Sequence, residues 1–278
     1  TDGGTITLVA NTGIADSAGT AGLDIDSNTG NVSLTNDGVT AGTFVDYITG
    51  AFALDDFGLT VVATTTSGNV TFDSLSTGTL TLTSVNTAAN NLSVTADGNV
   101  IATDVDTTTG TLTLATSAGT MVLTDVDSTE GAMNIDATST ITVTAVNSTT
   151  GEINIETSGA SDIAIALAGI GSASGNVIVT ANNAAGTITL ADGIEKITVA
   201  GADADVTLSA GATIAVTGGA DNDVDIDAGG TISLTADTIT AVDVEALDTL
   251  VIGDTGAGAI TVDELTGSTI AATTITVG

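Results

Sequence analysis

Glycine recurs along the chain at a nearly constant step, and this periodicity restricts the fold more than any other feature of the sequence. In the C-terminal part the markers are Gly175, Gly193, Gly211 and Gly229, a step of about 18 residues. Upstream the step lengthens to about 20 residues, with markers at Gly30, Gly50, Gly68, Asn90, Gly110, Gly131 and Gly151. A constant step of this length is typical of repeat architectures, in which each repeat packs on its neighbours.

The segments between the markers alternate apolar and polar residues, as in Thr111–Leu114 and Thr187–Leu190. This period of two, rich in β-branched residues, predicts strands with one apolar face. Two inward columns follow the upstream markers. The first holds Val32, Phe52, Val70, Leu92, Leu112, Met133, Ile153 and Val177, and the second holds Leu34, Leu54, Phe72, Val94, Leu114, Ile135, Ile155 and Val179.

In the C-terminal part, the 18-residue step predicts further columns. They are Ile188, Val206, Val224, Val242 and Ile260; Leu190, Leu208, Ile226, Val244 and Val262; and Ile214, Ile232 and Leu250 beside Val216, Leu234 and Ile252. Constant-step columns of like residues favour strands stacked coil on coil over a sandwich of hairpins. The sequence therefore predicts an all-β chain that forms a single parallel β-helix (β-solenoid) over 1–278, with about fourteen coils of roughly 18–21 residues.

The regularity varies along this predicted solenoid. Residues 30–68 are the least regular and contain Phe44, Tyr47, Phe52 and Phe57, whereas residues 175–278 are the most regular. Phe52 falls on an inward column. For the other three aromatic residues, a packed loop and a contact surface for a partner both remain open. Because the chain starts at Thr1 without Met, we expect a processed protein or a segment of a longer one.

The charge of the chain excludes several classes of partner. It carries 34 acidic residues against one basic residue, for a formal charge of −33, yet 42% of its residues are hydrophobic. Nucleic acid is excluded as a partner because neutralising phosphates needs Lys and Arg. Direct membrane insertion is not expected, since no apolar run approaches about 18 residues.

Catalytic chemistry has few candidates in this sequence. His and Cys are absent, and Lys196 is the one basic residue, expected to be outward and solvated within Ile194–Ile197. A zinc site would lack imidazole and thiolate, and no phosphate-binding loop occurs. We therefore expect no enzymatic activity, no catalytic residues and no organic cofactor. A polysaccharide-active β-helix enzyme is the weakest alternative, since Arg and exposed aromatic residues are lacking.

Acidic residues fall into two clusters that predict cation sites. The 18-residue step stacks Asp225 on Asp243 and Asp205 on Asp223, and it places Asp227, Glu245 and Asp263 in one outward column. Like charges on adjacent strands repel, and carboxylate oxygens are the ligands that Ca²⁺ prefers. A solvated acidic face screened by salt is the alternative. The candidate metal ligands are Asp221, Asp223, Asp225, Asp227, Asp243 and Glu245 in one cluster, and Asp104, Asp106, Asp125 and Asp127, flanked by Asn86 and Asn147, in the other.

The coil pattern resembles known families. A coil start of Gly-x-[Val/Ile/Leu]-x-[Val/Ile/Leu] and a later Val-[Asn/Asp]-[Ser/Thr], seen at residues 85, 105, 126 and 146, resemble the β-solenoid stalks of filamentous haemagglutinin-like adhesins and autotransporter passenger domains. This resemblance implies a secreted or cell-surface rod and carries over no catalytic residues. Residues 218–226 resemble, locally, a calcium-binding RTX repeat, with both leading glycines and Asp223 in place.

We expect an extracellular structural protein: a stalk, surface-layer element or filament subunit that associates head to tail with copies of itself and with divalent cations. A calcium- or ligand-binding module, RTX-like or ice-binding, is the alternative. Ice binding needs a regular threonine array, and the stacking of Thr113 on Ser93 and Asn134 does not provide one.

Overall fold

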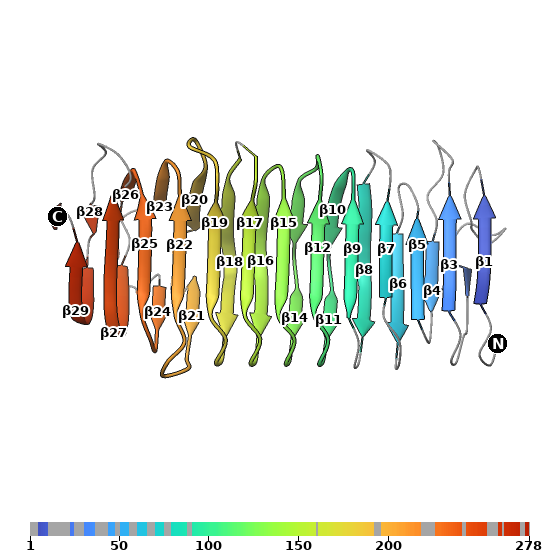
Figure 1. Ribbon diagram of the computed structural model, residues 1–278, viewed down its shortest axis with the longest axis horizontal. Helices are drawn as coiled ribbons and strands as arrows, with labels where there is room; N and C mark the ends of the chain where they lie inside the picture. The colour runs from blue at the N-terminus through green and yellow to red at the C-terminus, as the bar shows by residue number, and fades with distance from the viewer. Residues whose placement is uncertain are drawn as a thin grey trace. The chain divides into compact units, whose positions relative to one another are not determined.

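The structure is a computed structural model, and every described element is a β-strand. It describes residues 5–10, 23–24, 31–36, 44–47, 51–55, 60–65, 70–74, 79–87, 91–159, 161–191, 196–217, 226–240, 243–254, 261–262, 264–272 and 276–277. The chain divides into two compact units, Thr1–Ile135 and Asp136–Gly278. Each unit is a stack of parallel strands in the manner of a β-solenoid, and the prediction of that fold class is confirmed (Figure 1). The continuity of one solenoid over 1–278 stays a prediction.

The first unit contains three stacks of strands. One stack consists of β1 (Thr5–Ala10), β3 (Asn31–Asn36), β5 (Ala51–Asp55), β7 (Val70–Ser74), β9 (Leu92–Ala96) and β12 (Leu112–Thr116). The strands of the other two are β2 (Leu23–Asp24), β4 (Phe44–Tyr47), β6 (Thr60–Thr65), β8 (Thr79–Thr87), β10 (Asn99–Ala102), β11 (Val105–Thr107), β13 (Met121–Leu123) and β14 (Val126–Ser128). The boundary between the units falls within β15 (Met133–Ala137).

The second unit repeats this arrangement. Its first stack consists of β17 (Ile153–Thr157), β19 (Val177–Ala181), β22 (Val206–Ala210), β25 (Ile232–Ala236), β27 (Asp243–Asp254) and β29 (Glu264–Ala272). The remaining strands are β16 (Ile141–Ser148), β18 (Ile163–Ser172), β20 (Thr187–Ala191), β21 (Ile197–Val199), β23 (Thr213–Thr217), β24 (Ile226–Ala228), β26 (Thr238–Thr240), β28 (Thr261–Val262) and β30 (Thr276–Val277). No helix long and apolar enough to cross a membrane occurs among the described residues.

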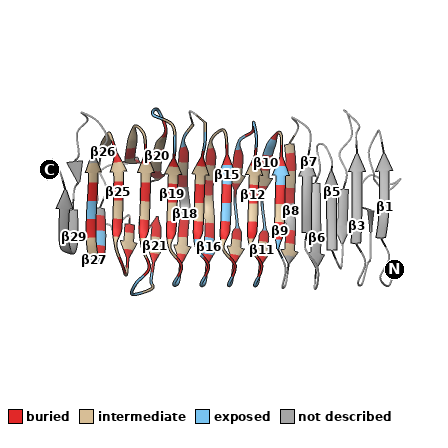
Figure 2. Ribbon diagram, in the orientation of Figure 1, coloured by how far each residue is buried: buried red, intermediate tan, exposed pale blue. Residues whose placement is uncertain are grey.

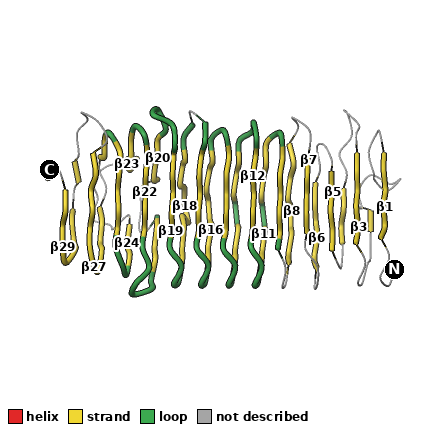
Figure 3. Tube along the Cα trace, viewed as in Figure 1, coloured by secondary structure: helices red, strands yellow, loops and turns green. Residues whose placement is uncertain are grey.

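The strands whose side chains the structure describes, from β8 to β27, bury alternate residues, and together these form the core (Figure 2). β12 and β22 both show buried residues at their first, third and fifth positions. The buried residues are almost all Val, Ile, Leu and Ala, as the alternation in the sequence predicts. Turns link the strands and lie outside the stacks (Figure 3).

The upstream columns predicted from the sequence are confirmed within each unit. Val70 pairs with both Phe52 and Leu92, and Leu112 follows Leu92 in the same column. In the second unit Ile153 pairs with Val177. The marker-to-strand spacing therefore identified the first stack correctly.

The 18-residue columns are wrong for most of the C-terminal part. Val206 pairs with Val177 and Ile232, and Leu208 pairs with Val179 and Leu234. The coils that start at positions 153, 177 and 206 are therefore all longer than the predicted step, and no two of them are equal in length. Because longer coils use up the chain sooner, the expected count of fourteen coils is too high.

The 18-residue step linked strands of different stacks. It leads from Ile188 in β20 to Val206 in β22, and these two strands are not coil-to-coil partners. The step is correct farther on, where Ile232 pairs with Leu250 and Leu234 with Ile252. Predicted column members at 224, 242 and 260, and the aromatic residue Phe57, lie outside the described residues.

Two of the buried corners place a hydroxyl group three residues before a glycine. The Ser128 hydroxyl donates a hydrogen bond to the Gly131 carbonyl at 2.7 Å, and the Ser172 hydroxyl accepts one from the Gly175 amide at 2.8 Å. A Cβ atom at Gly131 would overlap the carbonyl of Gly110 one coil away. The glycine step therefore reflects close approach of backbones between coils.

Replacing Leu208 by Ala should lower the free energy of unfolding by about 2–5 kcal/mol, because Leu208 is fully buried between Val179 and Leu234. Urea unfolding followed by circular dichroism measures this loss. The matched control is Thr207→Ala, an outward neighbour in β22, for which we expect a loss of less than about 1 kcal/mol. Equal losses for the two variants would contradict the register.

Candidate functional site

The clearest grouping of chemistry-bearing side chains in the first unit is an acidic column on β11 and β14. We define the acidic column as Asp104, Asp106, Asp125 and Asp127. Asp106 pairs in register with Asp127 on the following coil. The backbone amide of Val105 donates to the carbonyl of Asp125 at 3.0 Å, which sets the coils side by side here. The predicted stacking of Asp106 on Asp127 is confirmed.

Asn86 lies one coil before Asp106 in the same outward row. Its side-chain amide donates a hydrogen bond to a carboxylate oxygen of Asp106 at 3.3 Å. The row Asn86, Asp106, Asp127 thus starts with a neutral donor that stabilises the adjacent carboxylate. An amide in this place reduces the repulsion that a third carboxylate would add.

The pKa of the Asp106 carboxyl is raised above its ordinary value of 3.8. Partial burial is the largest cause, followed by repulsion from Asp104, Asp127 and Asp125, while the hydrogen bond from Asn86 acts in the opposite direction. The pKa of Asp125 is also raised, by burial first and then by Asp127 and Asp104. Both shifts mean that the fold disfavours the charged forms of these groups.

The geometry of the acidic column bears on cation binding. Among the residues that the structure describes, no group of three or more carboxylates is placed so that it could share one metal ion. Adjacent coils hold these side chains in rows, whereas a Ca²⁺ ion takes about 6–8 oxygen ligands around a centre. Calcium binding at the acidic column stays a prediction.

The second predicted cluster is described only in part. Asp227 in β24 pairs with Glu245 in β27, as predicted. Asp243 lies at the start of β27 and pairs with Glu264. Three of the candidate ligands, Asp221, Asp223 and Asp225, and with them the RTX-like segment, lie outside the described residues, as does Asp263.

The predicted stacking of Asp205 on Asp223 is replaced by a different contact. The Asp205 carboxylate accepts a hydrogen bond from the backbone amide of Thr231 at 2.7 Å, and the Asp205 amide in turn donates to the Asn176 side chain at 2.9 Å. Asp205 therefore joins the coils on either side of it, and the register places Thr231 next to it where the 18-residue step had placed position 223. Asn99 makes the same kind of bond, accepting from the Thr120 amide at 2.9 Å.

These side-chain-to-backbone bonds between coils were missed by the sequence reasoning. In these bonds the residue whose amide donates comes directly before a strand. The amide of Thr111, for example, precedes β12 and donates to the side-chain oxygen of Asn91 at 2.9 Å. The signal was available: Asn or Asp recurs at the position immediately before a predicted strand. Such residues favour hydrogen bonds to nearby backbone groups in turns.

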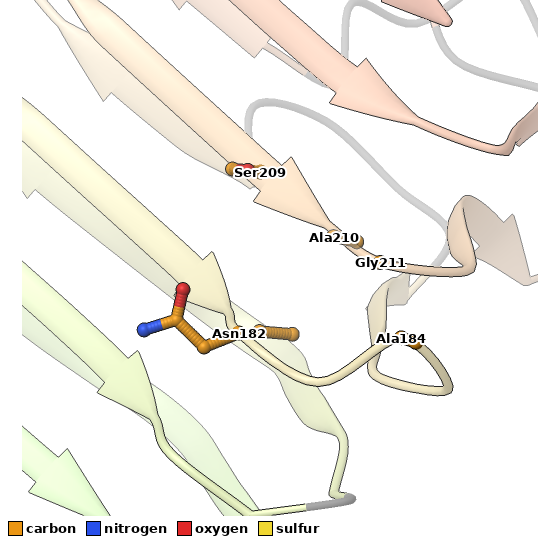
Figure 4. A pocket seen from close by; sticks show the side chains of 6 residues that line it. Asn182, Ala184, Ser209, Ala210 and Gly211 are labelled. Atoms are coloured by element: carbon orange, nitrogen blue, oxygen red, sulfur yellow. The ribbon is translucent and has the colours of Figure 1, made fainter. Parts of the chain in front are cut away.

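A shallow pocket opens at a corner of the second unit, with a volume of about 390 Å³ (Figure 4). It is lined by Ala181, Asn182, Ala184, Ser209, Ala210 and Gly211. The side chain of Asn182 donates a hydrogen bond to Glu156 on the preceding coil, so its amide is already engaged. The lining is small and uncharged, and it includes no basic or acidic side chain that could activate the Ser209 hydroxyl as a nucleophile.

Lys196 does not occupy the solvated position expected from the sequence. It is 6% exposed, and Ile197 beside it is buried as well, so the alternation begins only at Ile197. Its backbone carbonyl accepts a hydrogen bond from the amide of Ile170 at 2.8 Å. The one basic side chain of the protein is therefore held within the fold.

The comparisons with known proteins add no relative to this description. The chain matches no protein-family model, no curated protein and no solved structure. The resemblance to adhesin stalks and to RTX repeats stays a prediction.

Replacing Asp106 by Asn should raise the free energy of unfolding at pH 7 by roughly 0.2–1 kcal/mol, because it removes a like charge between two coils. A carboxyl group whose pKa is raised in the folded state destabilises the fold above that pKa, and the penalty disappears as pH falls below 3.8. The gain should therefore be present at pH 7 and absent at about pH 3. Thermal melts at both pH values measure it.

The matched control is Asp203→Asn, which removes the same charge from an exposed turn of the second unit. We expect no measurable change for it at either pH. A fall in stability of Asp106→Asn at pH 7, in a buffer that contains millimolar Ca²⁺ but not with chelator, would instead identify the acidic column as a calcium site.

Proposed function

We propose that this chain is a non-enzymatic structural protein of the cell exterior, a β-solenoid that serves as a stalk, surface-layer element or filament subunit. The observation that carries this proposal is the uniform coil-on-coil register. In the first unit, one column runs from Val32 through Phe52, Val70 and Leu92 to Leu112 without a shift. A stack of this kind provides length and rigidity through repetition alone.

The surface chemistry supports the same proposal. The formal charge of −33 keeps such chains apart from nucleic acid and anionic lipid, and it favours solubility. The described outward rows hold mostly Thr, Ser, Asn and Asp, with no cluster of nucleophile, base and oxyanion donors. A stalk needs a soluble surface and a core built by stacking, and this chain has both.

We further propose that copies associate head to tail. Each coil forms its backbone hydrogen bonds with the coils on either side, so a coil without a neighbour presents unpaired amide and carbonyl groups. A second copy that continues the register would satisfy these groups. Such a contact is heterologous and does not close, and it therefore produces a filament.

Trypsin should leave the folded protein intact. The only peptide bond it recognises follows Lys196, which is 6% exposed and held in the stack by its carbonyl's bond to Ile170. Proteolysis needs local opening of this coil. Electrophoresis after overnight digestion should show one full-length band in buffer and two fragments in denaturant. Rapid cleavage in buffer would contradict the burial of Lys196.

Head-to-tail association can be measured directly on the purified chain. Light scattering across a concentration series should show a mass that grows without a fixed stoichiometry, and negative-stain electron microscopy should show unbranched filaments. The association should persist at high salt, because strand pairing rather than charge drives it. Monodisperse monomers at millimolar concentration would overturn the head-to-tail proposal, and a closed dimer would do so as well.

A further inference from the structure

Four asparagines of the chain begin the sequence Asn-x-Ser or Asn-x-Thr, which is the acceptor sequence for N-linked glycans when x is not proline. They are Asn31, Asn69, Asn91 and Asn147, and the chain contains no proline. The first three stand directly before Val32, Val70 and Leu92, which belong to one inward column. The acceptor sequence therefore recurs at one place of the coil. Asn69 lies outside the described residues, whereas the exposure of Asn91 and of Asn147 is described.

Strand geometry puts both parts of these two acceptor sequences on the outside. Asn91 is exposed and Ser93 is partly exposed, while Leu92 between them is buried. Asn147 and Thr149 are likewise exposed on either side of a buried residue. Successive side chains of a strand point to opposite faces, so an asparagine and the hydroxyl group two residues later share one face. In both sequences that face is the outer one.

The structural contact of Asn91 does not compete with a glycan. The Asn91 side-chain oxygen accepts a hydrogen bond from the backbone amide of Thr111 at 2.9 Å. An N-linked glycan is attached to the other atom of the amide, Nδ2, where it replaces one of two hydrogens. The carbonyl oxygen is retained. The bond that joins the two coils at this corner therefore survives the modification.

Asn147 lies in the outward row of its stack, beside a residue without a side chain. Asn147 pairs with Gly171 on the following coil, and a Cβ atom at Gly171 would come within 2.8 Å of the Asn147 side-chain oxygen. Glycine thus leaves space for the Asn147 side chain on the following coil. The amide lies on the outer surface of the stack, where an attached sugar meets solvent.

We propose that Asn91 and Asn147 are acceptor sites for N-linked glycans. The co-substrate is an oligosaccharide joined to a lipid pyrophosphate, and an oligosaccharide transferase catalyses the step. Nδ2 of the asparagine forms a bond to the anomeric carbon of the first sugar, and the bond from that carbon to the pyrophosphate oxygen breaks. The amide loses one proton to a base of the transferase, and the lipid pyrophosphate leaves. This proposal rests on the proposed location of the chain at the cell exterior.

Glycans at these positions are compatible with the proposed head-to-tail association. Both asparagines project from the outer faces of stacked strands, whereas coil-to-coil hydrogen bonds run along the stack. A bulky, hydrated sugar on an outer face hinders side-by-side contact between copies and leaves the strand edges of a terminal coil accessible. The modification therefore favours single, unbranched filaments over lateral bundles.

Secretion of the full chain from a eukaryotic host, behind a cleavable signal peptide, tests the proposal. Protein from the medium is compared by electrophoresis before and after an amidase that hydrolyses Asn-linked glycans. The wild-type chain should run as several glycoforms that the amidase converts to one faster band. The amidase leaves aspartate at each modified position, so peptide mass spectrometry should find aspartate in place of Asn91 and Asn147.

Two variants separate glycan acceptance from a change in the corner. Asn91→Gln and Ser93→Ala should each lose the same single glycan, and Ser93→Ala keeps the bond between Asn91 and Thr111. Ser93→Thr should retain the glycan, because it restores the acceptor sequence. The matched control is Asn99→Gln, since Asn99 makes the same kind of bond to the Thr120 amide at 2.9 Å but has no hydroxyl group two residues later. Its glycoforms should equal those of the wild type.

A secreted wild-type chain without a glycan at either position would overturn the proposal. Persistence of the Asn91 glycan in Ser93→Ala would overturn it as well. Neither result bears on the stalk or filament proposal, which light scattering tests on the unmodified chain.

Discussion

Parallel pairing of each strand with the same strand of the next coil is the interaction on which the rest of the structure depends. It places like residues over like residues, so a core made mostly of aliphatic side chains, such as the column through Val70, Leu92 and Leu112, is continuous from coil to coil. A chain with 2% aromatic residues can build a buried interior in this way because the side chains of each coil pack against those of the coils on either side. The same pairing makes stability cooperative over neighbouring coils rather than over the chain as a whole.

In-register stacking also places the outward-facing side chains of adjacent coils next to one another. Where the outward residue is Asp, a coil places carboxylates next to carboxylates, and after partial burial their repulsion is the next cause of the raised pKa of Asp106. Where it is Thr, like hydroxyl and methyl groups lie side by side, as in the row Thr187, Thr213 and Thr238. Asn at the coil corners has a different effect, since its side chain satisfies a backbone amide of the next coil, as Asn99 does for Thr120. In-register pairing therefore produces charge repulsion where Asp repeats, rows of hydroxyl and methyl groups where Thr repeats, and hydrogen bonds between coils where Asn lies at a corner.

The fold class and the upstream columns could be predicted because strand alternation and marker spacing are local properties of the sequence. The C-terminal register could not, since strands such as those around Ile188 and Val206 look alike and spacing alone does not tell a strand of another stack from a partner across coils. Asp227 and Glu245 are 18 residues apart and lie on coils that keep this step, so their pairing was predictable. Asp205 lies on a longer coil, so its contact with Thr231 was not. Burial of Lys196 was also beyond the pattern, because alternation assigns a side chain to a face without saying what covers that face.

The unequal coil lengths have a consequence for how such a chain changes over time. The coils that start at positions 153, 177 and 206 differ in length yet stack with their core columns in register, so the extra residues are accommodated between the columns, at corners and at the bulge where β18 pairs with β16. An insertion or deletion there leaves the column intact and costs little loop entropy. Related proteins can therefore differ in the length of their corners while their strands stay the same. New recognition surfaces can arise at a corner without repacking of the core.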